Sequence, residues 1–351
     1  MLEIDGSYGE GGGQLLRYSV ALAALLRKSV RIFNIRAKRS NPGLRPQHLN
    51  AVKTIVELVN GDVQGLKIGS TSITIKPRSR PRVSTYRVDI GTAGSISLLL
   101  QATLPVLLAA EKPIKMIIRG GTTVKWSPPI PYLQNVLLPN LQKFGVKASI
   151  KLVRRGFYPK GGGEVEVEVF PSYPLRSTKF DFFTAIKEIN VLSYVGNLPK
   201  HIAERQARAA IEVLRREGFS NKISKVIIDD KTPSTSKGTG ILVWAVTDEG
   251  IVGGDSIGEI GKRAEIVGKE AAEKIVKVLK TGASIDPHAL DNIVIYMALA
   301  EGSSMAISSE LTSHAKTAMD LCSWITGASF SYEVKDKWVK IRGLGIGFKP
   351  Q

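Results

Sequence analysis

A succession of strand, glycine-rich loop and helix occurs three times along this chain, and no other feature constrains its fold as strongly. The first copy spans Leu2–Leu22 and the second spans Arg87–Ala102. A third, fainter copy has a strand-like run at Ile293–Ala300, a loop at Glu301–Ser304 and then a helical segment that carries His314. Self-similarity of this kind predicts an internally repeated α/β architecture.

Each copy is followed by residues that alternate between apolar and polar, as in a half-buried strand. These runs are Leu66–Ile75, Gly163–Phe170 and Phe330–Ile341. We therefore expect an α/β (α+β) fold in which three repeated βαβαββ-like units form the main domain. A chain of 351 residues is long enough to form a second, smaller domain as well.

One stretch does not follow the repeat. From about Lys179 to Leu279 the pattern predicts a self-contained series of strands together with charged helices at Ile202–Arg216 and Ile260–Leu279. We predict that residues 181–279 form an inserted α/β domain between the second and third repeats. The main domain then comprises residues 1–180 and 280–351.

Lys and Arg number 49 against 31 Asp and Glu, which gives a net charge of +18 that attracts polyanions. The basic residues recur in clusters across segments that are predicted to be folded, and this favours an RNA- or nucleotide-binding surface. The alternative is a protein that is basic throughout without a specific partner. The clusters comprise Arg31, Arg36, Lys38, Arg39 and Arg45, then Arg78, Arg80, Arg82 and Arg87, then Arg154, Arg155 and Lys160.

The sequence contains no uninterrupted apolar run that is long enough to cross a bilayer, and it begins on Met1–Asp5 without a signal-like segment. Its single cysteine, Cys322, excludes an intrachain disulfide and falls in the apolar phase of a predicted helix. We therefore expect a cytoplasmic protein with no membrane partner. The pattern leaves open whether the chain forms a homodimer.

The loop Gly6–Gln14 is rich in glycine, which lets backbone amides approach a ligand closely at the start of a helix. It matches neither a dinucleotide-binding fingerprint nor a P-loop. Within it, Glu10 offers a hard oxygen ligand for a magnesium or manganese ion on a polyphosphate. Arg17 follows one helical turn later and can reach the same phosphates. A generic glycine turn is the alternative interpretation.

The segment Ile35–Leu49 places several cations on one loop. Arg36, Lys38 and Arg39 precede a Pro-Gly turn, and arginine pairs bidentately with phosphate oxygens. A solvated basic loop without a ligand explains the same pattern. His48, at the start of the following predicted helix, fits either a capping or a packing role.

His314 is the candidate nucleophile among only four histidines. A neutral imidazole can attack phosphorus and later leave again, so a positioned histidine can carry a nucleotide covalently. A lone histidine near a helix start is more often structural. A separate loop, Gly120–Tyr132, is rich in proline and carries aromatic residues, and we interpret it as a face on which a base can stack.

Taken together, these segments resemble the RNA 3′-terminal phosphate cyclase family. The match runs in one order through nearly the whole chain. The residues that carry it are Asp5-Gly6, Gly9 to Gln14 and Arg17; Ile35-Arg36, Arg39, Pro42 to Leu44 and Gln47 to Leu49; Gly91, Ala93 to Ser95, Leu100-Gln101 and Leu104-Pro105; Gly156 to Pro159 and Gly161 to Gly163; and Asp291, Met297 to Ala300 and His314.

The resemblance implies three repeated α/β units with a small inserted domain. It also implies an activity, the ATP-dependent conversion of an RNA 3′-phosphate into a 2′,3′-cyclic phosphate. In this mechanism the family's histidine takes AMP from ATP and passes it to the RNA 3′-phosphate. The neighbouring 2′-hydroxyl then attacks and AMP leaves. The expected partners are ATP, RNA with a 3′-phosphate end and a divalent ion, Mg²⁺ or Mn²⁺.

The resemblance also assigns roles to single residues. His314 matches the nucleophile, and Glu10 resembles the metal-binding carboxylate. The residues that resemble phosphate contacts are Arg17, Arg36, Arg39 and Gln47. Those that resemble ATP-binding positions are Gln101, His288, Ala289, Leu290, Asp291 and Asn292, with Pro131 as a residue that packs on adenine. The family commonly has an aromatic residue where His288 stands.

Two other protein classes compete with this interpretation. One is a non-catalytic RNA-binding paralogue of the same fold that takes part in ribosome assembly and lacks the nucleophile. The presence of His314 with Arg17, Arg36 and Arg39 argues against it. The other is an enolpyruvyl transferase on a related repeated fold, which needs neither a histidine nucleophile nor a charge of this size.

Overall fold

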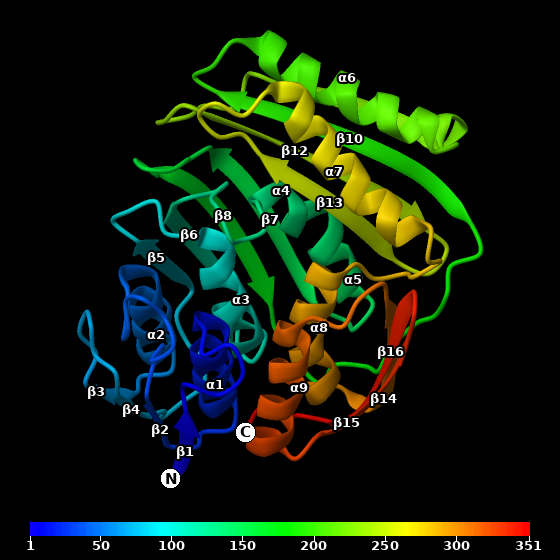
Figure 1. Cartoon of the computed structure of the whole chain (residues 1–351). Coiled ribbons are helices and arrows are strands. Elements are labelled where there is room, and N and C mark those ends of the chain that lie inside the picture. The colour runs from blue at the N-terminus through cyan, green and yellow to red at the C-terminus, as the bar shows by residue number, and fades with distance from the viewer.

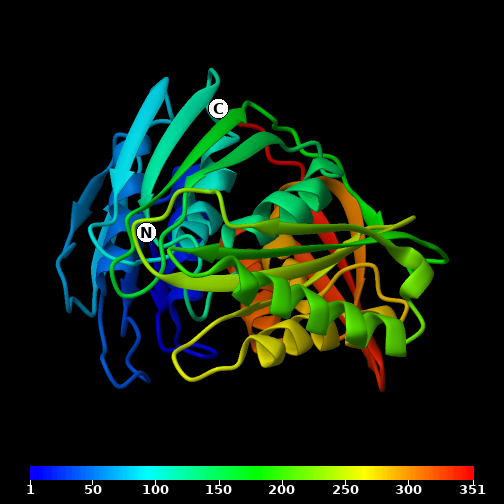
Figure 2. The same cartoon turned by 90° about the horizontal axis from the view of Figure 1, so that it is seen from above.

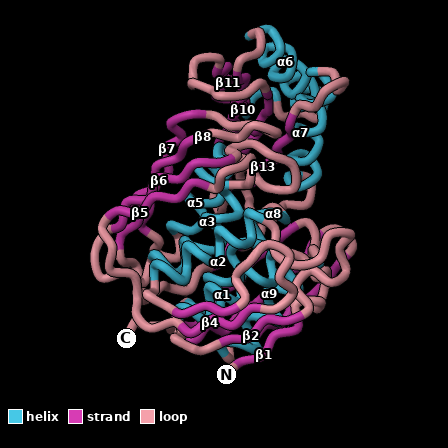
Figure 3. Tube along the Cα trace, turned by 90° about the vertical axis from the view of Figure 1, so that its left-hand side faces the viewer, coloured by secondary structure: helices cyan, strands magenta, loops and turns pink.

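A computed structural model describes all 351 residues and shows helices in the middle of the main body with sheets on its outside (Figures 1 and 3). Three of its four sheets have the same topology. In each of them the strands of one unit lie in the order first, second, fourth, third. The first pair is parallel and the other pairs are antiparallel. This agreement confirms the predicted mixed α/β fold built from repeated βαβαββ-like units.

The elements of the three units alternate as the repeat requires. The first unit has β1 (Leu2–Asp5), α1 (Gly13–Leu25), β2 (Val30–Phe33), α2 (Pro46–Leu58), β3 (Asp62–Gln64) and β4 (Ile73–Lys76). The second has β5 (Thr85–Asp89), α3 (Ile96–Leu107), β6 (Ile114–Gly120), α4 (Ile130–Tyr132), η1 (Leu133–Leu137), α5 (Leu138–Gln142), β7 (Lys147–Arg154) and β8 (Gly163–Phe170). The third has β9 (Lys179–Phe180), α8 (Pro287–Leu299), β14 (Glu301–Ser308), α9 (Ser313–Thr326), β15 (Ser329–Lys335) and β16 (Trp338–Ile346).

Helix α1 lies at the centre of the main body and packs against α2, α3 and α9. Every residue of α1 after Gly13 is buried, so the helix faces apolar neighbours on all sides. Burial of this kind is typical of a helix that is hydrophobic around most of its circumference, and Leu15 to Leu25 is apolar apart from Arg17 and Ser19, with Tyr18 carrying a hydroxyl. The central position of α1 brings the glycine loop before it close to the beginnings of α2 and α9.

The remaining sheet consists of strands from the inserted segment. Its elements are β10 (Ile186–Gly196), α6 (Lys200–Arg216), η2 (Ser220–Lys222), β11 (Ile223–Asp229), β12 (Gly238–Thr247), β13 (Ile251–Ile257) and α7 (Ala264–Leu279). Helices α6 and α7 cover one face of this sheet, as Figure 2 shows from above. Strand β13 contacts η1 of the second unit. The segment has a hydrophobic core of its own, and we propose on that basis that residues 181–279 form the inserted domain.

The point of insertion differs from the sequence prediction. Strand β9 pairs in parallel with β14, through Lys179 opposite Met305, and so supplies the first strand of the third sheet. The segment that follows β9 therefore interrupts the third unit, whereas the sequence placed it between the second and third units. A strand of two residues carries too little alternation to be recognised from the sequence.

The predicted strand Ile293–Ala300 is wrong, because these residues belong to helix α8 or end it. The predicted loop Glu301–Ser304 is the beginning of strand β14. The run is buried on all sides, and periodicity cannot separate a buried helix from a buried strand. The sequence did contain a helix signal at the beginning of α8, an N-cap residue followed by proline. Asp286 caps α8 by accepting from the backbone nitrogen of Ala289 at 3.0 Å, and Pro287 follows it.

Candidate functional site

His314 lies at the beginning of helix α9, where the chain turns after strand β14. The helix starts here because the Thr312 hydroxyl accepts a hydrogen bond from the backbone nitrogen of Ala315 at 2.9 Å, which satisfies one of the free donors of the first turn. The His314 side chain keeps 46% of its surface exposed. The imidazole therefore remains reachable by a ligand at a helix N-terminus, where the helix dipole favours anions.

Glu10 of the glycine loop lies against His314. Its Oε2 atom is 3.3 Å from Nδ1 of His314 and 3.7 Å from the guanidinium of Arg39, and its Oε1 atom accepts a hydrogen bond from Ser313. The loop is held on α9 because the Tyr8 hydroxyl donates to Asp320 at 2.7 Å. Glu10 and Arg39 of the first repeat and His314 of the third are thereby brought into one cluster.

Partial burial is the largest cause that lowers the pKa of His314 below its usual value of 6.5. The positive charges of Arg17 and Arg39 act in the same direction, while the carboxylate of Glu10 opposes them. The imidazole is therefore neutral at pH 7. The contact with Glu10 favours a proton on Nδ1, and that tautomer leaves the lone pair on Nε2 free.

We expect an NMR titration of the histidine ring protons, without ATP or metal, to give His314 a pKa below 6.5. His48 is the internal comparison, because burial, and then the charges of Arg17, Arg36 and Arg45, lower the pKa of His48 to about 3. The His48 resonance should not move between pH 5 and 8. A midpoint for His314 above 6.5 would contradict the described surroundings of its ring.

Arg17 is a buried cation that has no carboxylate partner. The residue is 7% exposed, and its side chain donates from Nε and Nη2 to Oε1 of Gln101, at 3.2 and 2.9 Å. Burial lowers its pKa to about 10, so the guanidinium stays charged at neutral pH. A buried charge is costly until an anion pairs with it. Arg17 is therefore positioned to gain from a phosphate group bound near α1.

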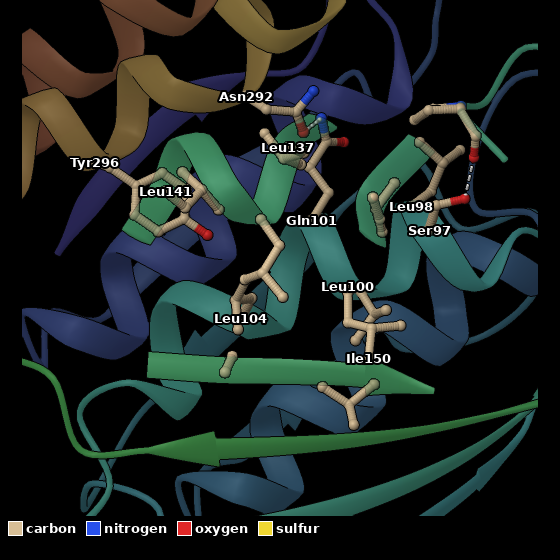
Figure 4. Close-up of a pocket in the computed structure, with 15 residues that line it drawn as sticks. Ser97, Leu98, Leu100, Gln101, Leu104, Leu137, Leu141, Ile150, Asn292 and Tyr296 are labelled. Atoms are coloured by element: carbon tan, nitrogen blue, oxygen red, sulfur yellow. Dashed lines mark hydrogen bonds between the residues drawn. The ribbon is translucent and has the colours of Figure 1, made fainter. Parts of the chain in front are cut away.

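Gln101 also links Arg17 to the third unit, because its side chain bonds to both Arg17 and Asn292. Its Nε2 atom donates to Oδ1 of Asn292 at 2.8 Å, and Asn292 in turn donates to the backbone oxygen of His288 at 2.7 Å. Figure 4 shows Gln101 and Asn292 facing one another at one end of a mostly apolar cavity of about 20 Å³. The chain of amides fixes the orientation of the Gln101 oxygen toward Arg17.

Further cations gather around the beginning of α2. Arg36 has φ of +56° and donates to the backbone oxygens of Asn41 at 2.7 Å and Gly43 at 3.2 Å. Burial lowers the pKa of Arg36, and the charges of Arg45 and Arg39 lower it further. A bound anion would relieve the mutual repulsion among these arginines.

His48 has the capping role that the sequence left open. Its Nδ1 accepts from the backbone nitrogen of Arg45 at 3.2 Å. Its Nε2 would lie 2.3 Å from a Cβ atom at position 13, so only glycine fits there beside this ring. The close packing holds the glycine loop against the beginning of α2.

Asp291 of helix α8 lies behind His314 in the third unit. Its carboxylate accepts from the hydroxyl of Thr312, and its backbone oxygen accepts from the Tyr18 hydroxyl at 2.6 Å. Burial is the main cause that raises the pKa of Asp291 to about 7, and the hydrogen bond from Thr312 opposes it. The bond to Asp291 fixes the Thr312 side chain that caps the helix of His314.

The structure places the remaining assigned residues in different surroundings. His288 is exposed in the first turn of α8, with its ring edge-on to Tyr132 at 6.5 Å, and Pro131 is buried next to Tyr132. Gln47 lies beside the second glycine loop, where its Cβ would be 3.4 Å from a Cβ at Gly94. Ala289 and Leu290 are fully buried in the core. The roles assigned to these positions stay predictions.

Sequence reasoning missed two residues of the cluster, Thr312 and Ser313. Thr312 had a recognisable signal, because threonine directly before a helical run is a typical N-cap. Ser313 had none, since its contact with Glu10 depends on the packing of the first repeat against the third.

The structure contains no group of three or more His, Cys, Asp or Glu side chains that could hold a metal ion. None of its helices has the length and apolar character of a membrane span.

Few classes of protein combine a triplicated α/β fold with a histidine among arginines at helix N-termini. Comparison with known proteins identifies the class to which this chain belongs. The family model described as RNA 3′-terminal phosphate cyclase matches residues 8–332. The chain belongs to this family. A protein named RNA 3′-terminal phosphate cyclase from Pyrobaculum aerophilum is 47% identical over 99% of both chains.

Other relatives carry the same name. The protein from Ignicoccus hospitalis is 49% identical over 90% of both chains, and that from Pyrococcus abyssi is 46% identical over 90% of this chain and 91% of its own. Among solved structures, the enolpyruvyl transferase NikO from Streptomyces tendae aligns with 48% of this chain and 32% of its own, at 17% identity and a TM-score of 0.28. A score this low supports no conclusion about fold or function.

Proposed function

We propose that this protein is an ATP-dependent RNA 3′-terminal phosphate cyclase that works through a covalent adenylate on His314. The observation that carries the proposal is the contact cluster of His314, Glu10 and Arg39, with the unpaired Arg17 close enough to affect the pKa of His314. Family membership and the names of the full-length relatives support the overall reaction. The same cluster argues against a non-catalytic paralogue, which would not need a neutral exposed imidazole among cations.

The first step uses the free lone pair on Nε2 of His314. This nitrogen attacks the α-phosphorus of ATP, a nitrogen–phosphorus bond forms, and the bond to pyrophosphate breaks. Arg17, Arg36 and Arg39 offset the negative charge of the phosphates and hold them for in-line attack. Positioning and charge neutralisation supply most of the rate in such transfers.

The later steps move AMP to the RNA and then release it. An oxygen of the RNA 3′-phosphate attacks the adenylate phosphorus, and the bond to His314 breaks. The 2′-hydroxyl then attacks the activated 3′-phosphorus, loses its proton, and expels AMP as the cyclic ester closes. The five-membered ring is strained, so the reaction requires the good leaving group that ATP provides.

Glu10 fits a divalent ion only together with a ligand. The absence of a protein cage of three ligating groups agrees with Mg²⁺, which commonly binds one or two carboxylates together with substrate phosphates. We propose that Glu10 holds Mg²⁺ or Mn²⁺ on the phosphates of ATP. Such an ion adds positive charge where the leaving pyrophosphate develops negative charge.

The order of steps predicts the fate of a modified RNA. An oligonucleotide that ends in a 3′-phosphate on 2′-deoxyribose lacks the attacking hydroxyl. We expect it to accumulate as the adenylated strand, which gel electrophoresis with α-labelled ATP detects. The matched ribose strand should instead give the cyclic end and free AMP. If the deoxy strand were released without AMP but with its 3′-phosphate altered, the proposed sequence of steps would be wrong.

A further inference from the structure

Trp126 is a large aromatic side chain that the fold leaves without a partner. It is 94% exposed, whereas Trp244 is 9% exposed. Its backbone has φ of +61°, a left-handed conformation that bulky residues rarely adopt. An exposed indole in a strained backbone is unfavourable for folding on its own account. It therefore needs an explanation beyond the stability of the chain.

The loop of Trp126 is joined to helix α3, the helix that carries Gln101. It is closed at its base by a bond from the backbone nitrogen of Ile130 to the oxygen of Thr122 at 2.9 Å. The backbone oxygen of Pro128 accepts from the Ser97 hydroxyl, which Figure 4 shows as a dashed line. Pro128 also lines the same cavity as Gln101, the partner of Arg17.

A second exposed aromatic residue lies on the neighbouring turn. Tyr158 is 78% exposed, and its turn is joined to the Trp126 loop by a β-bridge between Thr123 and Phe157. Lys125 and Lys160 flank the two aromatic residues in the sequence and are also exposed. Lys125 is paired with Glu259 at 2.6 Å, whereas no carboxylate is paired with Lys160. Exposed rings beside exposed cations are typical of surfaces that bind single-stranded nucleic acid.

We propose that Trp126 and Tyr158 form a stacking platform for unpaired bases of the RNA strand that leads to the 3′-phosphate. The inference rests on the proposed function, which supplies a strand whose end must reach His314. Bases present an apolar face whatever their identity, so an aromatic platform holds any sequence. The net charge of +18 favours a nucleic acid over an apolar protein partner. Such a platform would bind RNA without sequence preference.

The test is a binding cycle carried out on the full chain without ATP. The probe is a single-stranded oligoribonucleotide with a 3′-phosphate, and its counterpart has abasic residues near that end. We expect Trp126→Ala to weaken binding of the normal strand about tenfold. We expect a change of less than about twofold for the abasic strand, because stacking has already been removed. Trp126→Phe should restore most of the affinity.

Tyr332→Ala is the matched control, since Tyr332 is an exposed aromatic residue on β15, outside the cluster. It should bind both strands as the unchanged protein does. Equal losses for normal and abasic RNA, or no loss for either, would overturn the platform. So would a dimer that Trp126→Ala dissociates, because the patch would then be a protein interface. Failure of the unchanged protein to take AMP from ATP would instead count against the proposed function, and the binding cycle would remain decisive.

Discussion

Replacing His314 by alanine is expected to abolish the transfer of AMP from ATP to the protein. The substitution removes the ring nitrogen that we propose forms the covalent bond, whereas Glu10 and the arginines stay in place. We expect a loss on the order of 10³-fold or more in self-labelling with α-labelled ATP, because nucleophile losses in enzymes reach this size and beyond. Conversion of RNA 3′-phosphate should fall in parallel.

His201→Ala provides a closely matched control. His201 is also the second residue of a helix, α6, and is exposed, but no carboxylate is in contact with it. Its removal should leave self-labelling unchanged. Equal labelling of His314→Ala and the unchanged protein would exclude His314 as the nucleophile, and loss in both variants would point to a general effect of the substitutions.

The second large effect is expected at Arg17. We expect Arg17→Met to slow self-labelling on the order of 10²-fold, as the loss of one preorganised donor at a developing charge does in other enzymes. Arg17→Lys should recover only part of the rate, because a lysine offers a charge without the planar fork that grips two oxygens. The measurement is the single-turnover rate of AMP transfer at saturating ATP.

Arg31→Met is the control for Arg17, because Arg31 is an exposed arginine that is paired with Glu3 at 3.1 Å. An exposed pair of this kind contributes at most about 1 kcal/mol, so neither rate nor stability should change much. Thermal unfolding should show that Arg17→Met remains folded. A folded Arg17→Met protein with an unchanged rate would remove Arg17 from the site.

Much of the fold could be predicted because local chemistry repeats. Each glycine loop precedes a helix, and Gly163–Phe170 is strand β8 as predicted, so much of the βαβαββ pattern can be read from the first two units. The predicted strand Leu66–Ile75 is wrong for residues 66–72, which connect β3 to β4. The prediction of a strand for residues 293–300 was wrong, because α8 is buried on all sides and its sequence therefore has no helical period of apolar residues. Strand β9 was also missed, since its two residues become a strand only through pairing with β14.

The site was predictable as a set of residue types and not as an arrangement. Glycine, arginine and histidine were informative because few other roles explain them together. The contact between Glu10 and His314, by contrast, depends on α1 packing against α9 across two repeats. The sequence also could not predict that Arg17 is buried without a carboxylate partner, because burial and contacts follow from the tertiary structure.

Locating the nucleotide on the protein decides whether His314 carries AMP. The chain is incubated with ATP and Mg²⁺ or Mn²⁺, digested under mildly alkaline conditions that preserve a phosphoramidate, and analysed by mass spectrometry. We predict AMP on His314 alone, and its loss after acid treatment. Adenylate on the nearby Lys316, on any other side chain, or on none, would contradict it.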